Sequence, residues 1–305
     1  MKSIAWVVTS VLAISVLAGC GRPVSTVSVD REASVWAKAT GTKHAFLVGI
    51  NQYQMPGNNL RGCVNDIQDV QSKMLTPQGF KDIKVLTDKQ ATRANILSGL
   101  SSMVKSAQPG DFLYFHYSGH GAQVDDTNGD EPDGQDEILC PTDLKVANGT
   151  FQNAVVDDEI KSILGQLKPG VGFLMVSDSC HSGSIDQMSQ GFSATQPRAF
   201  NMPAHLANAT PLQANSTLMN AYQNRVRGGQ YVVITGCEDD QTSADAYING
   251  RYNGALTYYL LDTFTKGGAN QTYGQWHKSI LAGLSKGGYD QRPVLVGNAN
   301  AKIFQ

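Results

Sequence analysis

The chain has 305 residues, of which 41% are hydrophobic and 16% are charged, so it can bury a sizeable core as one domain or as a tightly joined pair. The formal net charge of −2 gives no electrostatic basis for binding a polyanion. We therefore expect no nucleic-acid partner.

The first 19 residues have the pattern of a signal peptide. Lys2 precedes an apolar stretch over residues 4–17, which is short for a membrane span. The stretch runs into LAGC at 17–20, which resembles a bacterial lipobox and predicts cleavage before Cys20 and lipidation of that residue. Residues 20–42 would then be a lipidated tether, and the protein would be anchored in the cell envelope at the outer membrane or its periplasmic face. An ordinary signal peptide with a chance cysteine is the alternative.

Strand and helix patterns alternate from residue 43 onward. In chain order the expected strands are 43–50, 83–86, 111–117, 171–176, 230–235 and 293–296. The expected helices are 65–76, 93–106, 158–167, 254–264 and 273–284. This alternation favours an α/β fold with a mostly parallel central sheet and helices on both faces.

The composition changes between residues 187 and 228. Arg198 is the only charged residue between 187 and 224, where Gln, Asn, Ser, Ala and Pro dominate. We interpret 187–228 as a surface linker, which joins a large part (43–186) to a small part (229–305).

A histidine and a cysteine each follow one of the expected strands. His120 lies in YSGHG at 117–121, and Cys180 lies in DSCHSG at 178–183. Because the carboxyl ends of parallel strands meet at one edge of a sheet, we expect the two side chains to be neighbours. Such a pair is typical of a cysteine hydrolase. A buried structural cysteine and histidine are the alternative.

Five ordered motifs resemble the caspase-like cysteine peptidases, and among them the metacaspase or orthocaspase branch. The motifs are HAFLVGIN at 44–51, LRGCVND at 60–66, HYSGHG at 116–121, DSCHSG at 178–183 and TGCEDDQTSAD at 235–245. The resemblance implies a caspase-like fold in which Cys180 is the nucleophile and His120 the general base and acid. It also implies an oxyanion hole formed by the backbone N–H groups of Gly121 and Cys180.

Two other histidines compete with His120 as the base. The side chain of His181 should diverge from that of its neighbour Cys180, and His116 lies inside an expected strand, in the core. His120 therefore remains the better candidate. Because the nucleophile must stay a free thiol, we do not expect Cys63, Cys140, Cys180 and Cys237 to form two disulfides.

The resemblance further implies a pocket for the substrate residue before the scissile bond, the P1 residue. Asp66, Ser118 and Asp178 would line this S1 pocket. A buried pair of carboxylates is costly without a cation, so we expect cleavage after Arg, then Lys, and not after Asp. The alternative for Asp66 is a helix cap.

An acidic segment at 125–137 carries seven Asp or Glu residues and no basic residue. Such a segment must be solvated or neutralised by a cation. The resemblance implies a regulatory Ca²⁺ site, and oxygen ligands suit that ion. Its expected ligands are Asp136, Asp157, Asp158 and Asp186. A solvated loop with Asp157 as a helix N-cap is the alternative.

Three arginines of the linker region would themselves suit an acidic pocket. They are Arg198, Arg225 and Arg227, and self-cleavage after one of them would release a loop beside the active site.

The sequence thus predicts a lipid-anchored, calcium-responsive cysteine endopeptidase, monomeric, acting on proteins or peptides with Arg or Lys at P1. The runner-up is a non-catalytic, calcium-responsive binding module of the envelope on the same fold. A third interpretation is another cysteine hydrolase or a transpeptidase that uses the same acyl-enzyme.

Overall fold

The structure is a computed structural model, and it describes residues 39–125, 135–147, 150–180, 195–200, 230–238 and 241–305. The expected signal peptide and the lipidation site Cys20 lie outside these residues, as do His181, Asp186, Arg225 and Arg227. Within the described ranges, no helix combines the length and the apolar character that crossing a membrane requires.

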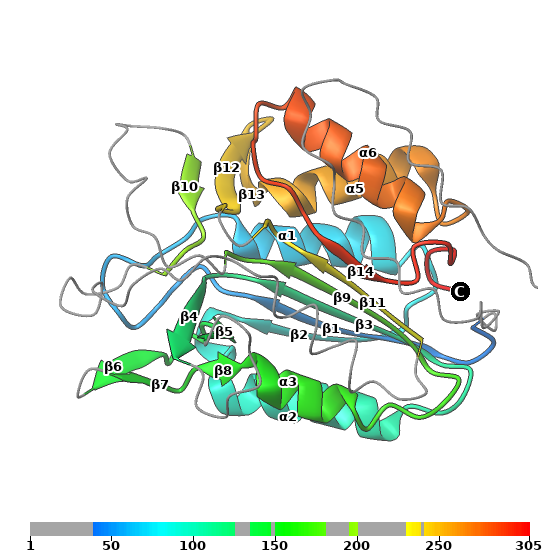
Figure 1. Cartoon of the computed structure of the whole chain (residues 1–305), viewed down its shortest axis with the longest axis horizontal. Coiled ribbons are helices and arrows are strands. Elements are labelled where there is room, and N and C mark those ends of the chain that lie inside the picture. The colour runs from blue at the N-terminus through cyan, green and yellow to red at the C-terminus, as the bar shows by residue number, and fades with distance from the viewer. Residues whose placement is uncertain (1–38, 126–134, 148–149, 181–194, 201–229, 239–240) are drawn as a thin grey trace, which may run out of the picture.

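A six-stranded sheet forms the middle layer, with the order β14-β11-β9-β3-β1-β2 (Figure 1). Its strands are β1 (Lys43–Gly49), β2 (Asp82–Thr87), β3 (Phe112–Ser118), β9 (Gly172–Asp178), β11 (Gln230–Thr235) and β14 (Leu295–Gly297). Neighbouring strands are parallel, except that β14 runs antiparallel to β11. Every residue of β3 and β9 is buried, as expected of parallel strands covered on both faces.

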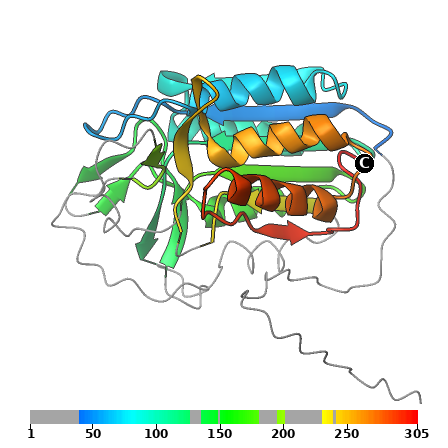
Figure 2. The same cartoon turned by 90° about the horizontal axis from the view of Figure 1, so that it is seen from above.

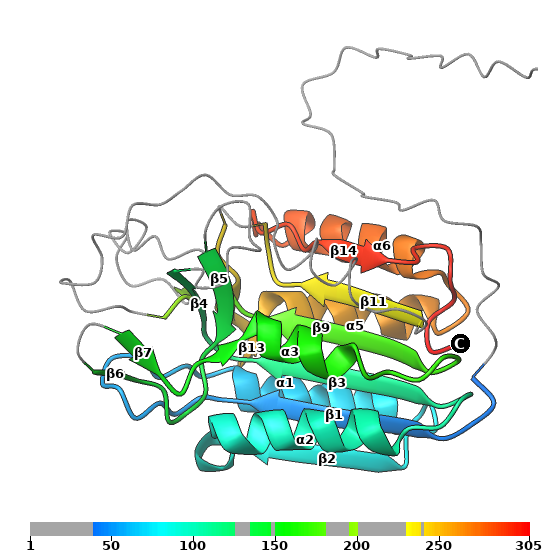
Figure 3. The ribbon, with the colours of Figure 1, turned by 60° about the horizontal axis from the view of Figure 1, so that its bottom comes forward.

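Helices cover both faces of the sheet. On one face lie α1 (Cys63–Asp69), continued by the π-helical η1 (Val70–Leu75), and then α5 (Ala255–Gly267) and α6 (Tyr273–Lys286), side by side in Figure 2. On the other face lie α2 (Arg93–Ser106) and α3 (Asp157–Leu164), in front of the sheet in Figure 3. The short 3₁₀ helix η2 (Asp88–Gln90) precedes α2.

The two faces form two hydrophobic cores. Side chains alternate between the two faces of a strand. In β1, Phe46 and Val48 therefore lie in the core between the sheet and α2, and Ala45 and Leu47 lie in the core between the sheet and helices α1 and α5. The predicted α/β fold, with a mostly parallel sheet and helices on both faces, is confirmed.

Short antiparallel strands, which the sequence did not predict, accompany the central sheet. One group consists of β4 (Gly121–Asp125), β5 (Gln135–Leu139) and β8 (Val155–Val156), and a hairpin consists of β6 (Lys145–Ala147) and β7 (Thr150–Gln152). A second group of three consists of β10 (Thr195–Pro197), β12 (Ala244–Ile248) and β13 (Arg251–Gly254).

One part of the expected surface linker forms a strand and carries buried side chains. Residues 195–200 contain β10, which pairs with β12, and the side chain of Arg198 is fully buried. The interpretation of 187–228 as a surface loop is therefore wrong for Arg198 and Phe200, which are buried, whereas Thr195 is exposed. A buried positive charge needs anionic partners. The aspartates of the candidate active site, described below, are the partners of Arg198.

His116 lies inside β3 and is fully buried, in the core as predicted. Its Nδ1 is 2.7 Å from the hydroxyl of Tyr114, and its Nε2 is 3.3 Å from Oγ1 of Thr257. Burial lowers the pKa of His116 from 6.5 to about 4. The imidazole is thus neutral at neutral pH.

We predict that His116 destabilises the protein as the pH falls from about 6.5 to about 4. In this range the imidazole binds a proton in the unfolded chain but not in the folded one, so acid favours unfolding. The change in pKa corresponds to roughly 3 kcal/mol of unfolding free energy. Denaturant titrations at several pH values should show a smaller loss on acidification for His116→Gln than for the wild type. Identical pH dependence of the two proteins would contradict the prediction.

Candidate active site

Strand ends at the carboxyl edge of the central sheet deliver the candidate catalytic residues. The register pairs Ser118 at the end of β3 with Asp178 at the end of β9, so the residues that follow them are neighbours. A Cβ atom placed on Gly121 would lie 2.0 Å from the backbone oxygen of Cys180. Only glycine permits this approach, and it brings the two predicted motifs together.

The thiol of Cys180 is buried against the backbone of Ser243. The N–H of Ser243 donates to Sγ at 2.7 Å, and the thiol donates to the oxygen of Ser243 at 3.3 Å. Within the described residues, no hydrogen bond joins this thiol to His120. The structure thus brings the two loops together while the sulfur rests on Ser243.

The hydrogen bonds of His120 fix its tautomer. Its Nε2 is 2.8 Å from the backbone oxygen of Asn58, and because a carbonyl oxygen can only accept, Nε2 carries the hydrogen. Nδ1 therefore presents a lone pair, and it is buried with no hydrogen-bond partner among the described residues. Burial lowers the pKa of His120 to about 4, although the hydrogen bond to the backbone of Asn58 opposes the shift. The side chain is thus a neutral base at neutral pH.

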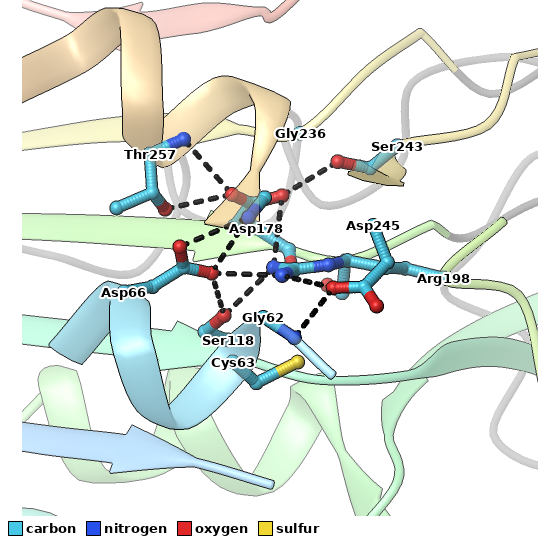
Figure 4. Close-up of polar contacts among 12 residues, drawn as sticks. Gly62, Cys63, Asp66, Ser118, Asp178, Arg198, Gly236, Ser243, Asp245 and Thr257 are labelled. Atoms are coloured by element: carbon cyan, nitrogen blue, oxygen red, sulfur yellow. Dashed lines mark hydrogen bonds and ion pairs between the residues drawn. The ribbon is translucent and has the colours of Figure 1, made fainter. Parts of the chain in front are cut away.

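The side chain of Arg198 fills the expected S1 pocket (Figure 4). Its Nη2 is 2.7 Å from Oδ2 of Asp66, and its Nη1 donates to Oγ of Ser118 at 2.7 Å and lies 3.3 Å from Oδ1 of Asp178. A third carboxylate, that of Asp245, is 3.0 Å from Nη2. The guanidinium and all three carboxylates are 0% exposed. We call Asp66, Ser118, Asp178 and Asp245 the acidic pocket.

Asp66 faces the acidic pocket and does not cap a helix. Helix α1 begins after Gly62 without a side-chain cap, and Oδ1 of Asn51 accepts the N–H of Cys63 at 2.9 Å. The Asp66 carboxylate instead accepts from the side chain of Asn253 at 2.9 Å, besides its contact with Arg198. The cap alternative is therefore wrong. Burial raises the pKa of Asp66 to about 7, although the charge of Arg198 opposes the rise.

Asp178 is held at the N-terminus of α5. Its Oδ2 accepts from both the N–H and the hydroxyl of Thr257, at 2.9 and 2.7 Å, and its Oδ1 accepts from the hydroxyl of Ser243 at 2.6 Å. The helix dipole favours a negative charge at this position. A Cβ placed on Gly254 would lie 2.1 Å from Oδ2 of Asp178 and 2.5 Å from Nη1 of Arg198, so a glycine closes this side of the pocket.

Asp245 is the pocket residue that the sequence analysis missed. It lies on β12, and its carboxylate accepts the N–H groups of Arg61 and Gly62, both at 2.9 Å. A signal was present, because Asp245 ends the fifth motif at 235–245. Its role depends on the pairing of β12 beside the loop before α1, which the sequence pattern did not predict.

The backbone around Arg198 lies across the site as an extended peptide. Strand β10 pairs antiparallel with β12, and the N–H of Arg198 donates to the oxygen of Ser243 at 2.9 Å. The oxygen of Arg198 accepts from the N–H of Gly121 at 3.1 Å. Ser243 thus contacts both the thiol of Cys180 and the Arg198 backbone, while the expected oxyanion donor holds the Arg198 carbonyl.

The other cysteines are buried and form no disulfide. Cys63, Cys140 and Cys237 are free, as is Cys180, in the part of the chain that the structure describes. Burial raises the pKa of the Cys63 and Cys140 thiols well above the usual value, so neither is a candidate nucleophile.

Two of the expected calcium ligands, Asp157 and Asp158, contact a buried lysine, and a third, Asp136, is buried on β5. Nζ of Lys161 is 2.8 Å from Oδ2 of Asp157 and 3.2 Å from Oδ1 of Asp158, and its side chain is 0% exposed. Among the described residues, no three His, Cys, Asp or Glu side chains are arranged to hold a metal ion. Lys161 thus supplies a cation to two expected ligands, and the described residues alone do not fit Ca²⁺.

The chain is similar in sequence to a known protein family and in structure to a solved protein. Residues 43–189 match the family "Metacaspase, peptidase C14 domain". Metacaspase-1A of Aspergillus niger is 34% identical over 295 residues, which cover 85% of this chain and 71% of the relative. Metacaspase-1 of Emericella nidulans is 33% identical with the same coverage. The crystal structure of protein GSU0716 from Geobacter sulfurreducens is similar with a TM-score of 0.63 and 29% identity, covering 87% of this chain and 99% of that one.

Proposed function

The chain belongs to the metacaspase family of caspase-like cysteine endopeptidases, and from this premise we propose that it cleaves proteins after Arg or Lys through Cys180 and His120. The proposal rests mainly on one observation, the guanidinium of Arg198 enclosed by three fully buried carboxylates. The Arg198 backbone supports it, because its carbonyl oxygen lies at the N–H of Gly121.

The acidic pocket favours Arg over other P1 residues for an electrostatic reason. Its three carboxylates are out of water, so an occupant with a positive charge offsets part of the repulsion between them. Arg places both terminal nitrogens among the carboxylates and Ser118, as Arg198 does. Lys offers a single point of charge, and Asp would add a further negative charge.

The proposed chemistry uses the tautomer that Asn58 imposes on His120. Nδ1 of His120 takes the proton of the Cys180 thiol, and the sulfur attacks the carbonyl carbon of the P1 residue. The developing oxyanion accepts from the N–H of Gly121. The imidazolium then gives its proton to the departing amine, and water hydrolyses the thioester with the same base. The thiol must first leave Ser243, with which it is hydrogen-bonded here.

We predict hydrolysis of short fluorogenic peptides that end in Arg, weaker hydrolysis of those that end in Lys, and none of those that end in Asp. Cys180→Ala and His120→Ala should each abolish the activity. Asp245→Asn should lower kcat/KM on the Arg peptide by roughly 10- to 100-fold, because a buried hydrogen-bonded charge pair is broken. Asp262→Asn, on a half-exposed part of α5, is the matched control and should not change the rate.

Two results would contradict this proposal. Efficient cleavage after Asp would show that the acidic pocket does not bind the P1 residue. A folded protein that hydrolyses none of the peptides would favour the non-catalytic binding module.

We further propose that the protein cleaves its own chain between Arg198 and Ala199. The Arg198 side chain fills the pocket, and its carbonyl already lies at the oxyanion donor, so this bond is held as a substrate bond would be. Mass spectrometry of purified protein should find a fragment that begins at Ala199. Cys180→Ala and Arg198→Gln should both keep this bond intact. A wild-type chain that stays whole there while it cleaves peptides would contradict the proposal, and cleavage after Arg225 or Arg227 would appear in the same spectra.

Calcium activation stays a proposal, because one expected ligand, Asp186, lies outside the described residues. Calcium would compete with Lys161 for Asp157 and Asp158. We therefore predict that Ca²⁺ raises the melting temperature of Lys161→Met more than that of the wild type. Peptide hydrolysis with Ca²⁺ and with a chelator measures the regulatory effect. Equal melting temperatures with and without Ca²⁺ in both proteins, together with unchanged hydrolysis, would exclude a calcium site.

Lipid anchoring through Cys20 also stays a proposal, which mass spectrometry of the membrane fraction would test.

A further inference from the structure

The segment that continues from Arg198 is also held by the body of the protein. The N–H of Phe200 donates to the oxygen of Gly121 at 3.1 Å, while the N–H of Gly121 donates to the oxygen of Arg198. Both backbone groups of one glycine thus hold the chain on the two sides of Ala199. If Arg198 is the P1 residue, Phe200 is the second residue after the scissile bond, the P2′ residue.

The side chain of Phe200, at the end of the short described segment 195–200, is buried and only 3% exposed. Its ring lies edge-on to His120, with 5.7 Å between the ring centroids, and edge-on to Tyr53 and Phe151, with 6.0 Å to each. These three rings come from other parts of the chain, and edge-to-face packing at such distances is favourable between aromatic rings.

The rings around Phe200 are held in place by the residues of the active site. The hydroxyl of Tyr53 accepts the backbone N–H of His120 at 2.7 Å, and the Tyr53 ring lies 4.8 Å from the imidazole. Phe151 lies on β7 and packs against the same core. Three aromatic rings, one of them the proposed catalytic imidazole, therefore surround the place of the P2′ side chain.

We propose that Tyr53, Phe151 and His120 form a subsite that selects substrates with an aromatic or large apolar side chain at P2′. The inference rests on the proposed cleavage after Arg and deepens it: the protein's substrates carry Arg at P1 and a large apolar residue two positions after the cut. An aromatic side chain there also covers His120, which is 2% exposed with Phe200 in place. Substrates with a small or charged P2′ residue lose this packing.

The test uses the full-length protein and internally quenched peptides that copy 195–200. One peptide contains Thr-Gln-Pro-Arg-Ala-Phe, and its partners carry Leu, Ala or Asp in place of the Phe. We expect kcat/KM for the Phe peptide to exceed that for the Ala peptide by on the order of 10- to 100-fold, with Leu between them. In Phe151→Ala the ratio should fall toward one, since the Phe peptide loses more than the Ala peptide, and Phe151→Leu should give a ratio between the two.

Tyr247→Ala removes an aromatic ring that is 51% exposed on β12 and is the matched control, which should keep the wild-type ratio. Equal kcat/KM for the Phe and Ala peptides in the wild type would overturn the subsite and leave cleavage after Arg standing. Hydrolysis of none of the Arg peptides would overturn both proposals. A ratio unchanged in an active Phe151→Ala protein would overturn the role of Phe151.

Discussion

The ion cluster around Arg198 is the interaction on which the arrangement of the site depends. A guanidinium among three carboxylates, all removed from water, offsets part of the repulsion between the carboxylates, and hydrogen bonds from neighbouring groups must stabilise the negative charge that remains. The carboxylates come from α1, β9 and β12, so no single segment of the chain can build the pocket. The cluster therefore ties the segments that precede and follow residues 187–228 to each other.

The same requirement explains the polar environment of each carboxylate. Asp178 takes its donors from the first turn of α5, and Asp245 takes its donors from the backbone before α1. Asp66 bonds to the Asn253 side chain and to Ser118. These donors do not depend on Arg198, so the pocket remains a set of oriented acceptors when another cation takes its place. A preorganised acidic pocket is what selection of a positively charged side chain requires.

Much of this arrangement could be predicted from the sequence, and the rest could not be predicted for physical reasons. The buried parallel strands are continuous apolar runs, and their ends place His120, Cys180, Ser118 and Asp178 at one edge. Asp245 acts through the pairing of short strands, whose few residues carry too little periodicity to be recognised. The position of Arg198 could not be predicted from the residues around it in the sequence, because a polar, uncharged composition is typical of an exposed linker. In the structure, the ion pairs of Arg198 with three buried carboxylates determine where it lies.

The backbone contacts on the two sides of Ala199 bear on how permanent a cut in this protein's own chain would be. Gly121 holds the carbonyl of Arg198 and the N–H of Phe200, and the rings of Tyr53 and His120 hold the Phe200 side chain. The newly freed amino group of Ala199 would thus remain beside the thioester at a high effective concentration. Water and this retained amine would compete for the same acyl group, and the peptide bond could re-form. Departure of residues 199–200 from the site, or hydrolysis of the thioester, rather than the first bond cleavage, would then make the processing irreversible.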